Sequence, residues 1–540
     1  MAGGNLSRGQ ALMQLVRAYG IETVFGMPGV HTLEYYRGIA DAGMRHVLFR
    51  HEQGGGFMAD GHARISGKPA LCCVITGPGV TNIATAVGNA YADSQPMLVI
   101  ASTNGSGDLG AGRGRLHEIT DQLATIRPLT AHAQTILDGR QIPGAVHRAF
   151  STFASGRPRP CYIELPIDRI AETAEFAVRT SPITGPLAPD AAAVEKAAAI
   201  AAGARQPVII AGGGTIDHGE ALRVLAERLG AAVALTIAGK GALPESHPLN
   251  CGACLASPLA HALVENADVV IAVGTELSET DIWKDPDFLE LKGRLIRIDV
   301  DAGNLARDYT PDAALLGDAG LTMTMLAEAL PAAGGHPGFT GSGAIADLRR
   351  KVMEQLLASP RAARFTAVLD AMRDAIPDDG WLITDATQIA YFANEYWPTS
   401  RPRTYTHPNG YCTLGSAMPS AIGAKLGSPG RHGVALTGDA GFLFTASELA
   451  TAVDEKVGLP IVLWNNDGLG QIRDGMIERD IAPVGVTPGR NPDFGALASA
   501  FGARSSRPGS LPELTGIIRE AFDADGPTLI EVREDAGFLD

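Results

Sequence analysis

Residues 433–467 read GVALTGDAGFLFTASELATAVDEKVGLPIVLWNND, and this stretch decides the fold. Two short apolar runs, GVALT and PIVLW, flank a segment with helical spacing, which predicts two parallel strands joined by a helix. Gly438, Asp439 and Ala440 follow the first strand, and Asn465 and Asn466 follow the second. Because the carboxyl ends of parallel strands share one edge of a sheet, these polar side chains are expected to lie close together.

The polar residues at this edge suit a divalent cation. The carboxylate of Asp439, the amide oxygen of Asn466 and the main-chain carbonyl of Gly468 would offer three oxygen ligands, which Mg²⁺ prefers. The first amides of the intervening helix, at Gly441 and Phe442, can receive phosphate groups. For either end alone, a turn aspartate or an asparagine pair that caps a helix remains the ordinary alternative.

The same pattern of strands and helices repeats along all 540 residues. The apolar runs end in glycine-rich or polar turns, as in parallel sheets covered on both faces; they include IETVFG, ALCCVITG, MLVIAS, PVIIAG, DVVIAVG and RLIRIDVD. Residues 181–191 and 331–343 are rich in Pro, Gly and small residues and interrupt the pattern. The sequence therefore predicts an α/β protein with three doubly wound parallel-sheet domains, at residues 1–180, 190–332 and 345–540.

Composition excludes several classes of partner. The formal net charge of −15 opposes binding to nucleic acid, which requires clustered Lys and Arg. No apolar stretch approaches the roughly 20 residues of a membrane helix, and residues 1–20 lack the apolar core of a secretion signal. We therefore expect a cytoplasmic protein without a membrane or nucleic-acid partner. Cys251 and Cys254 form a single CxxC without nearby ligand residues, so we expect a structural role for them.

The stretch from Gly438 to Asn466 resembles the diphosphate-and-magnesium motif of thiamine diphosphate enzymes. The third residue of that motif is usually Gly, and Ala440 takes its place in this chain. Such enzymes also place a glutamate against the aminopyrimidine ring of the cofactor. The segment RHEQGGGFMADGHAR, residues 50–64, supplies Glu52 for this role. A proton shared between this carboxylate and the ring would activate the thiazolium carbon. The segment ITGPGVTN, residues 75–82, resembles the pyrimidine-binding turn, which implies cofactor contacts by Thr76, Pro78 and Asn82.

Two further segments match the same family. In HPNGYCTLGSAMPSAIGAK, residues 407–425, the resemblance implies that the carbonyl of Cys412 and the amide of Leu414 hold the aminopyrimidine. Leu414 would also be the wedge that bends the cofactor, so that its imino nitrogen reaches the thiazolium carbon. In TDATQIA, Gln388 falls where relatives place a polar side chain on the diphosphate. An exposed glutamine after a strand is the alternative reading.

The resemblance covers essentially the whole chain. It implies a pyrimidine-binding domain, a central domain and a diphosphate- and Mg-binding domain, in that order. In this family Glu52 of one subunit would face Asp439 of another, so a homodimer is the minimum and a homotetramer is expected. The central Gly212–Gly214 run is weak evidence for a nucleotide, and we expect neither FAD nor another nucleotide there.

The reaction is not settled by the fold. Pyruvate decarboxylases carry adjacent histidines and a glutamate after the Asn pair, whereas this chain has no His-His and has Ile472 at that place. Acetolactate synthases carry a tryptophan near Gly475 and an arginine in the loop that here reads VGTELSETDIW. An acetolactate synthase-like carboligase acting on pyruvate stays open as an alternative. A noncatalytic cofactor-binding homologue is a second one, disfavoured because Glu52, Asp439 and Asn466 are all present.

This chain lacks the marker residues of pyruvate decarboxylases and acetolactate synthases and carries acidic residues in the corresponding segments. Carboxylates pair well with a guanidinium group, so they would suit a cationic 2-oxo acid substrate, although solvated surface carboxylates are the ordinary alternative. The substrate candidates are His117, Glu118, Glu276, Asp281 and Asp474.

Several segments together resemble the 5-guanidino-2-oxopentanoate (2-ketoarginine) decarboxylases, among them FGMPGVHTLEYYRG and QIRDGMIERDIAPVGVTPGRNPDF. That resemblance implies a 2-oxo acid substrate and the products carbon dioxide and 4-guanidinobutanal. His31 and Gln471 are candidates for handling the substrate carboxylate and the proton that completes the reaction. A structural role is equally open for each of them.

Overall fold

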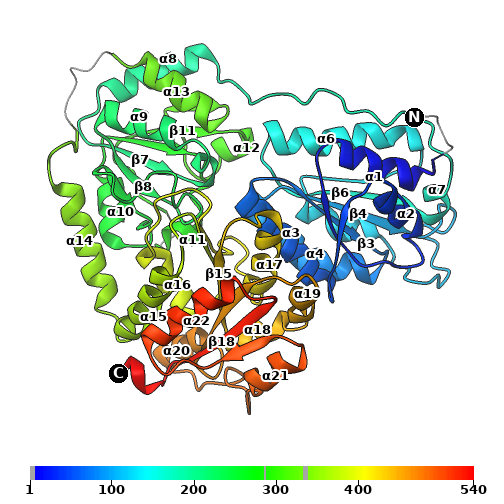
Figure 1. Cartoon of the computed structure of the whole chain (residues 1–540). Coiled ribbons are helices and arrows are strands. Elements are labelled where there is room, and N and C mark those ends of the chain that lie inside the picture. Colours follow the sequence, from blue (N-terminus) through cyan, green and yellow to red (C-terminus); the bar gives the residue numbers. More distant parts are fainter. Residues whose placement is uncertain (1–5, 285–287, 332–337) are drawn as a thin grey trace.

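The computed structural model describes residues 6–284, 288–331 and 338–540. Three six-stranded sheets follow one another along the chain, and every strand pairing within them is parallel (Figure 1). Their strand orders are β2-β1-β3-β4-β6-β5, β12-β11-β10-β7-β8-β9 and β14-β13-β15-β16-β18-β17. Helices lie between successive strands in each unit, except between β8 and β9, where the structure describes none. The predicted α/β class with three doubly wound parallel sheets is therefore confirmed. The exact domain boundaries stay a prediction, and residues 332–337 of the second predicted linker lie outside the described residues.

The first sheet contains β1 (Thr23–Gly26), β2 (Arg45–Leu48), β3 (Ala70–Val74), β4 (Met97–Thr103), β5 (His132–Thr135) and β6 (Cys161–Pro166). Its helices are α1 (Arg8–Ala18), α2 (Leu33–Asp41), α3 (Glu52–Ser66), α4 (Pro78–Ala92), α5 (Gln122–Ile126), α6 (Ile142–Ser155) and α7 (Ile167–Ile170). Both α3 and α4 begin directly after strands of this sheet, so their first residues lie at its carboxyl edge.

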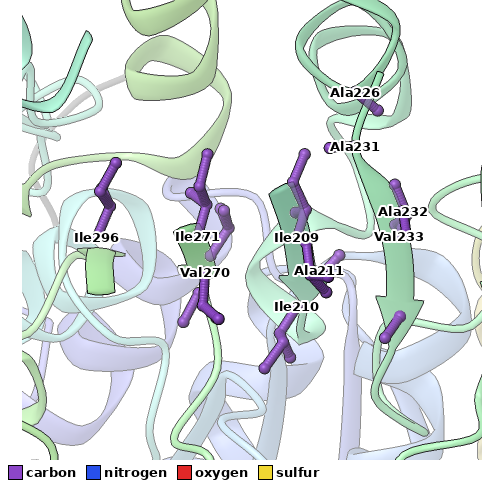
Figure 2. Close-up of a cluster of buried hydrophobic side chains, with 14 of the residues drawn as sticks. Ile209, Ile210, Ala211, Ala226, Ala231, Ala232, Val233, Val270, Ile271 and Ile296 are labelled. Atoms are coloured by element: carbon purple, nitrogen blue, oxygen red, sulfur yellow. The ribbon is translucent and has the colours of Figure 1, made fainter. Parts of the chain in front are cut away.

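The second sheet contains β7 (Pro207–Ala211), β8 (Ala232–Leu235), β9 (Asn250–Gly252), β10 (Val269–Val273), β11 (Arg294–Asp299) and β12 (Ala313–Leu316). Its helices are α8 (Ala191–Ala202), α9 (Gly219–Leu229), α10 (Pro258–Glu265), α11 (Glu279–Ile282), α12 (Ala302–Leu305) and α13 (Ala319–Ala329). Figure 2 shows Ile209, Ile271 and Ile296 side by side on neighbouring strands, and each is fully buried. Continuous apolar strands of this kind require cover on both faces of the sheet.

The third sheet contains β13 (Trp381–Thr384), β14 (Tyr405–Thr406), β15 (Gly433–Gly438), β16 (Leu459–Asn465), β17 (Arg504–Ser506) and β18 (Pro527–Arg533). Its helices are α14 (Ala344–Leu357), α15 (Ala362–Ala375), α16 (Gln388–Tyr396), α17 (Ala417–Gly427), α18 (Asp439–Thr445), α19 (Glu448–Asp454), α20 (Gly470–Glu478), α21 (Phe494–Ala500) and α22 (Leu511–Phe522). The single helix predicted between β15 and β16 is thus two helices. The N–H groups of Leu449 and Ala450 bond to carbonyls three residues back, at Ala446 and Ser447, and these tight bonds form the turn that separates them.

Helices α3 and α17 pack backbone against backbone and join the first unit to the third (Figure 1). A Cβ atom on Gly61 would lie 1.9 Å from the carbonyl oxygen of Ser420, and one on Gly423 would lie 1.8 Å from that of Met58. Only glycine permits so close an approach. The helix that begins at Glu52 is therefore fixed against the third sheet of its own chain. Within the described residues, no helix is both long and apolar enough to cross a membrane.

Candidate active site

Strands β15 and β16 place the predicted metal ligands side by side. The two strands pair in register, with Gly438 opposite Trp464, so Asp439 and Asn466 follow adjacent strand ends. The side-chain amide of Asn466 lies 2.8 Å from the carbonyl oxygen of Gly468 and 3.3 Å from Oδ1 of Asp439. With the amide oxygen turned toward them, these groups give three oxygen ligands on one side of a cation. The donor set is the one that Mg²⁺ prefers.

The Asn466 amide has two orientations. In one, its Nδ2 donates a hydrogen bond of 3.2 Å to Oε1 of Gln388 and its oxygen lies toward Asp439 and Gly468. In the other, its Nδ2 donates to the carbonyl oxygen of Gly468 and to Oδ1 of Asp439. A cation bound beside Asp439 would select the first orientation, because only an oxygen can be its ligand. Gln388, predicted to contact the diphosphate, thus lies beside the metal ligands.

Asn491 is a residue of this site that the sequence did not reveal. Its Nδ2 donates a hydrogen bond of 2.7 Å to Oδ2 of Asp439, which is 1% exposed. Burial raises the pKa of the Asp439 carboxyl, and the Asn491 bond opposes that rise. The second carboxylate oxygen is therefore held in place while Oδ1 faces the other two ligands. Asn491 comes from a loop without motif spacing, so only the folded chain reveals it.

Position 468 requires glycine, for two reasons. Its φ is +144°, a left-handed value that other residues rarely adopt, and a Cβ there would lie 2.3 Å from the carbonyl oxygen of Val486. This backbone conformation directs the Gly468 carbonyl toward Asn466. Ala440, Gly441 and Phe442 form the first turn of α18, with the Phe442 ring buried against Phe494 at 5.9 Å. Only the main-chain amides of this turn are thus available to a phosphate.

The other predicted end of the cofactor lies at the carboxyl edge of the first sheet. Glu52 is the first residue of α3 and is 8% exposed, and the amide of Asn82 donates a hydrogen bond of 2.9 Å to its carboxylate. The Thr76 hydroxyl donates to Gln122 at 2.7 Å, and Pro78 begins α4. Within the described part of one chain, no hydrogen bond joins Glu52 to the Asp439 end.

The loop with Cys412 and Leu414 is fixed by Asp385. The carboxylate of Asp385 accepts hydrogen bonds from the N–H of Gly415 at 2.9 Å and from the Thr437 hydroxyl at 3.1 Å. Thr437 precedes the metal motif, so one buried carboxylate connects the predicted wedge loop to that motif. Burial raises the pKa of Asp385 to about 6. Cys412 has a φ of +48°, a strained value typical of functional loops, and lies 3.7 Å from the Tyr391 hydroxyl.

Three family models match the chain. The N-terminal TPP binding domain of thiamine pyrophosphate enzymes matches residues 7–125, their central domain matches residues 194–326, and their C-terminal TPP binding domain matches residues 385–532. The chain belongs to the thiamine pyrophosphate enzymes. Thiamine pyrophosphate and thiamine diphosphate are the same cofactor, so the family and the cofactor predicted from the motifs are confirmed.

Curated relatives of this thiamine diphosphate enzyme cover nearly its whole length. It is 48% identical to the probable 2-ketoarginine decarboxylase of Pseudomonas aeruginosa, over 98% of this chain and 94% of the relative. It is 31% identical to a probable acetolactate synthase large subunit of Methanocaldococcus jannaschii, over 97% and 91%. The large subunit of acetolactate synthase isozyme 1 from Escherichia coli is 29% identical, over 97% and 93%.

Two predicted residues of this thiamine diphosphate enzyme form a histidine pair. The ring centroids of His31 and His117 are 5.5 Å apart, and His31 is 7% exposed. The Nδ1 atoms of both rings are buried without a hydrogen-bond partner within the described residues. Burial and the neighbouring His117 lower the pKa of His31. The main chain of His117 lies over Gly77, where a Cβ would be 2.3 Å from the His117 carbonyl oxygen, so the pair adjoins the predicted pyrimidine-binding turn.

Two of the four carboxylates predicted to recognise the substrate, Glu276 and Asp281, already have partners. Glu276 pairs with Arg157 at 2.6 Å and with Arg159 at 3.0 Å. Asp281 accepts hydrogen bonds from the Asn409 and Ser278 side chains at 3.2 Å each. Burial raises its pKa to about 6.

The two remaining carboxylates differ from each other. Asp474 pairs with Arg361 at 2.7 Å and accepts a hydrogen bond of 2.8 Å from Gln388. Glu118 accepts hydrogen bonds from the main-chain N–H groups of Arg113 and Arg115, and no cationic side chain of the described chain pairs with it. Gln471 is exposed in the first turn of α20.

Proposed function

We propose that this enzyme is a 2-ketoarginine decarboxylase. It converts 5-guanidino-2-oxopentanoate and a proton to 4-guanidinobutanal and carbon dioxide, a step of arginine catabolism. The observation that carries the proposal is the 48% identity, over 98% of the chain, to a relative named for this activity. The presence of Glu52, Asp439 and Asn466 supports catalysis over a noncatalytic role.

Residues 345–540 hold the diphosphate end of the cofactor, and residues 1–180 hold its aminopyrimidine. Oxygens of Asp439, Asn466 and Gly468 bind Mg²⁺, which their mutual approach in the structure supports. The main-chain N–H groups of Gly441 and Phe442 donate hydrogen bonds to the diphosphate. When bound, thiamine diphosphate supplies a nucleophilic carbon and an electron sink for the bond that breaks. The central domain, residues 190–332, needs no FAD in this proposal.

Glu52 exchanges a proton with the aminopyrimidine ring. Asn82 supports this role because its amide donates to the Glu52 carboxylate and fixes its direction. The Leu414 wedge and the Cys412 carbonyl hold the ring from the other domain. Within the described residues of one chain no hydrogen bond joins Glu52 to Asp439, which supports a site that Glu52 of one subunit and Asp439 of its partner complete together.

The histidine pair handles the substrate carboxylate and the proton that replaces carbon dioxide. Neither Nδ1 atom has a hydrogen-bond partner among the described residues, and each can donate to a carboxylate when protonated or accept from a hydroxyl when neutral. Gln471 is the candidate from the third domain for the same end of the substrate. Glu118 is the candidate for the guanidinium group, since it adjoins His117 and no cation in the described part of the chain pairs with its charge.

Exposed apolar residues near both ends of the proposed cofactor site, the Glu52 end and the Asp439 end, support a homodimer and a homotetramer built from it. Val30, Leu33 and Leu116 surround the histidine pair in sequence and are each 60% exposed. Phe444 and Ile472, beside the metal ligands in sequence, are 61% and 53% exposed. Exposed apolar patches of this kind mark interaction sites. The second copy of the chain covers them and supplies the other end of the cofactor site.

The function is tested on purified protein supplied with thiamine diphosphate and Mg²⁺. We expect release of carbon dioxide and an aldehyde from 2-ketoarginine, and neither rapid carbon dioxide release nor acetolactate from pyruvate. Acetolactate from pyruvate would instead establish the carboligase alternative. Glu118→Gln should raise KM for 2-ketoarginine and leave KM for the uncharged 2-oxopentanoate unchanged, which separates guanidinium recognition from general damage.

A further inference from the structure

Glu448 is a buried carboxylate that neither the metal site nor the substrate site accounts for. It is the first residue of α19, nine positions beyond Asp439, and its exposed fraction is 0%. A carboxylate in such a place is costly unless hydrogen bonds satisfy its oxygens. Glu448 therefore requires partners within reach, and two of them come from a different unit.

Two of the three partners of Glu448 are main-chain N–H groups of the first unit. Its carboxylate accepts hydrogen bonds from the N–H of Arg50 at 3.1 Å and from the N–H of His51 at 2.9 Å. The hydroxyl of Thr451 donates a third bond, at 2.7 Å. Burial raises the pKa of Glu448, and these hydrogen bonds oppose the rise.

These contacts fix the chain directly before Glu52. Arg50 and His51 are the two residues that precede α3, and His51 is its N-cap. A Cβ on Gly54 would lie 2.4 Å from Oε1 of Glu448, so the carboxylate reaches this place only because residue 54 has no side chain. The first turn of α3 and the carboxylate of Glu448 are therefore fitted to each other.

We propose that Glu448 is a positioning residue for Glu52. It belongs to the third domain, and it fixes the main chain at the start of α3 so that the Glu52 carboxylate keeps the direction needed to exchange a proton with the aminopyrimidine. The inference rests on the proposed role of Glu52. It needs no assumption about the substrate, because the direction of Glu52 matters before any substrate binds.

A first test needs no cofactor. Hydrogen–deuterium exchange of the amides of Arg50 and His51 should be faster in Glu448→Ala than in the wild type, since those amides lose their acceptor. Glu455→Gln is the matched control, because Glu455 also joins the third unit to the first, through a bond of 2.5 Å to Arg45, but does not touch the start of α3. Unchanged exchange at Arg50 and His51 in a folded Glu448→Ala protein would overturn the proposal.

The second test measures activation of the cofactor without substrate. In the holoenzyme with thiamine diphosphate and Mg²⁺, NMR follows deuterium exchange of the thiazolium C2 proton. Glu448→Ala should slow this exchange about ten- to a hundredfold, as a small misplacement of a catalytic group does. Cofactor affinity should change by less than about threefold, because the residue does not touch the cofactor's binding groups. Glu455→Gln should behave as the wild type.

The outcomes separate this inference from the proposed function. Wild-type C2 exchange in Glu52→Gln would refute the role of Glu52 itself. Slow exchange in Glu52→Gln with wild-type exchange in Glu448→Ala would refute only the positioning role. If Glu448→Ala does not fold, Glu448→Gln and Gly54→Ala decide the question. Glu448→Gln keeps one acceptor and should lie between the wild type and Glu52→Gln, whereas Gly54→Ala places a methyl group against the carboxylate and should slow exchange. Wild-type rates in both would overturn the proposal.

Discussion

The side-chain amide of Asn82, the fifth residue of α4, donates a hydrogen bond of 2.9 Å to the carboxylate of Glu52, the first residue of α3. Both helices begin at the carboxyl edge of the first sheet. Two separate segments of the chain therefore fix the orientation of the Glu52 carboxylate. A carboxylate held in this way loses little conformational freedom when a ligand approaches it. The bond therefore bears directly on how the proposed proton exchange is tested.

Glu52→Gln is expected to abolish turnover and leave thiamine diphosphate binding largely intact. The amide has nearly the same shape but cannot exchange a proton with the aminopyrimidine ring. Steady-state decarboxylation and cofactor titration by tryptophan fluorescence measure the two effects. Asn82→Ala should keep the carboxylate and lower kcat about tenfold, through loss of orientation. Undiminished activity of Glu52→Gln would reject the proposed role.

Asn491→Ala should weaken Mg²⁺ binding about 10- to 100-fold, because residues that orient a metal ligand affect affinity by this amount. The Asn491 amide holds the Asp439 oxygen that does not face the other ligands, and without it the carboxylate can rotate away. The measurement is the Mg²⁺ dependence of activity after the metal has been removed with a chelator. Asn266→Ala, on the surface of the central domain, is the control. An unchanged Mg²⁺ dependence in Asn491→Ala would mean that Asp439 needs no such support.

Gly468→Ala should destabilise the protein by about 1–3 kcal/mol, the usual cost of a strained backbone conformation. It should also weaken Mg²⁺ binding, because the loop must shift to relieve the contact with the Val486 carbonyl and takes the Gly468 carbonyl with it. Thermal unfolding and Mg²⁺ titration check the two parts. Gly489→Ala, in the loop between α20 and α21, adds a Cβ with no described atom within 4 Å and should leave both measurements unchanged. Equal effects of the two substitutions would contradict the argument.

The sequence predicts those parts of the molecule whose structure depends on residues that are adjacent in the chain. Continuous apolar runs such as ALCCV and DVVIAV form buried parallel strands, since no other element of that length buries both faces. Asp439 and Asn466 were predictable because they directly follow such strands. The short strand HAQT (β5) lacks this signal, because every one of its residues is only partly buried.

The contacts that the sequence did not predict depend on side-chain orientations, which are determined by tertiary packing. Asn491 comes from a loop, and Glu448 begins the second of two helices where the sequence predicts a single helix. Glu448 finds its partners about 400 residues earlier in the chain. No periodicity or spacing connects residues that far apart. The pairing of His31 with His117 is hidden for the same reason, although each residue was predicted separately.

His62 provides a test of burial through the pH dependence of stability. This side chain of α3 is 9% exposed, and burial lowers its pKa to about 4. Between pH 6.5 and about 4 the unfolded chain carries the His62 proton and the folded chain does not. The unfolded state thus binds more protons, and this residue reduces the free energy of unfolding by about 1.4 kcal/mol for each unit that the pH falls.

The stability difference between the wild type and His62→Gln isolates this effect, because the other titrating groups are common to both proteins and cancel. At pH 7 the wild type should be the more stable, since glutamine does not reproduce the packing of the ring against Gly427. The difference should shrink as the pH falls from 6.5 toward 4, because only the wild type acquires the unfavourable proton. Urea unfolding at a series of pH values measures it. A difference that stays constant over this range would show that His62 is protonated as readily in the folded protein as in the unfolded chain.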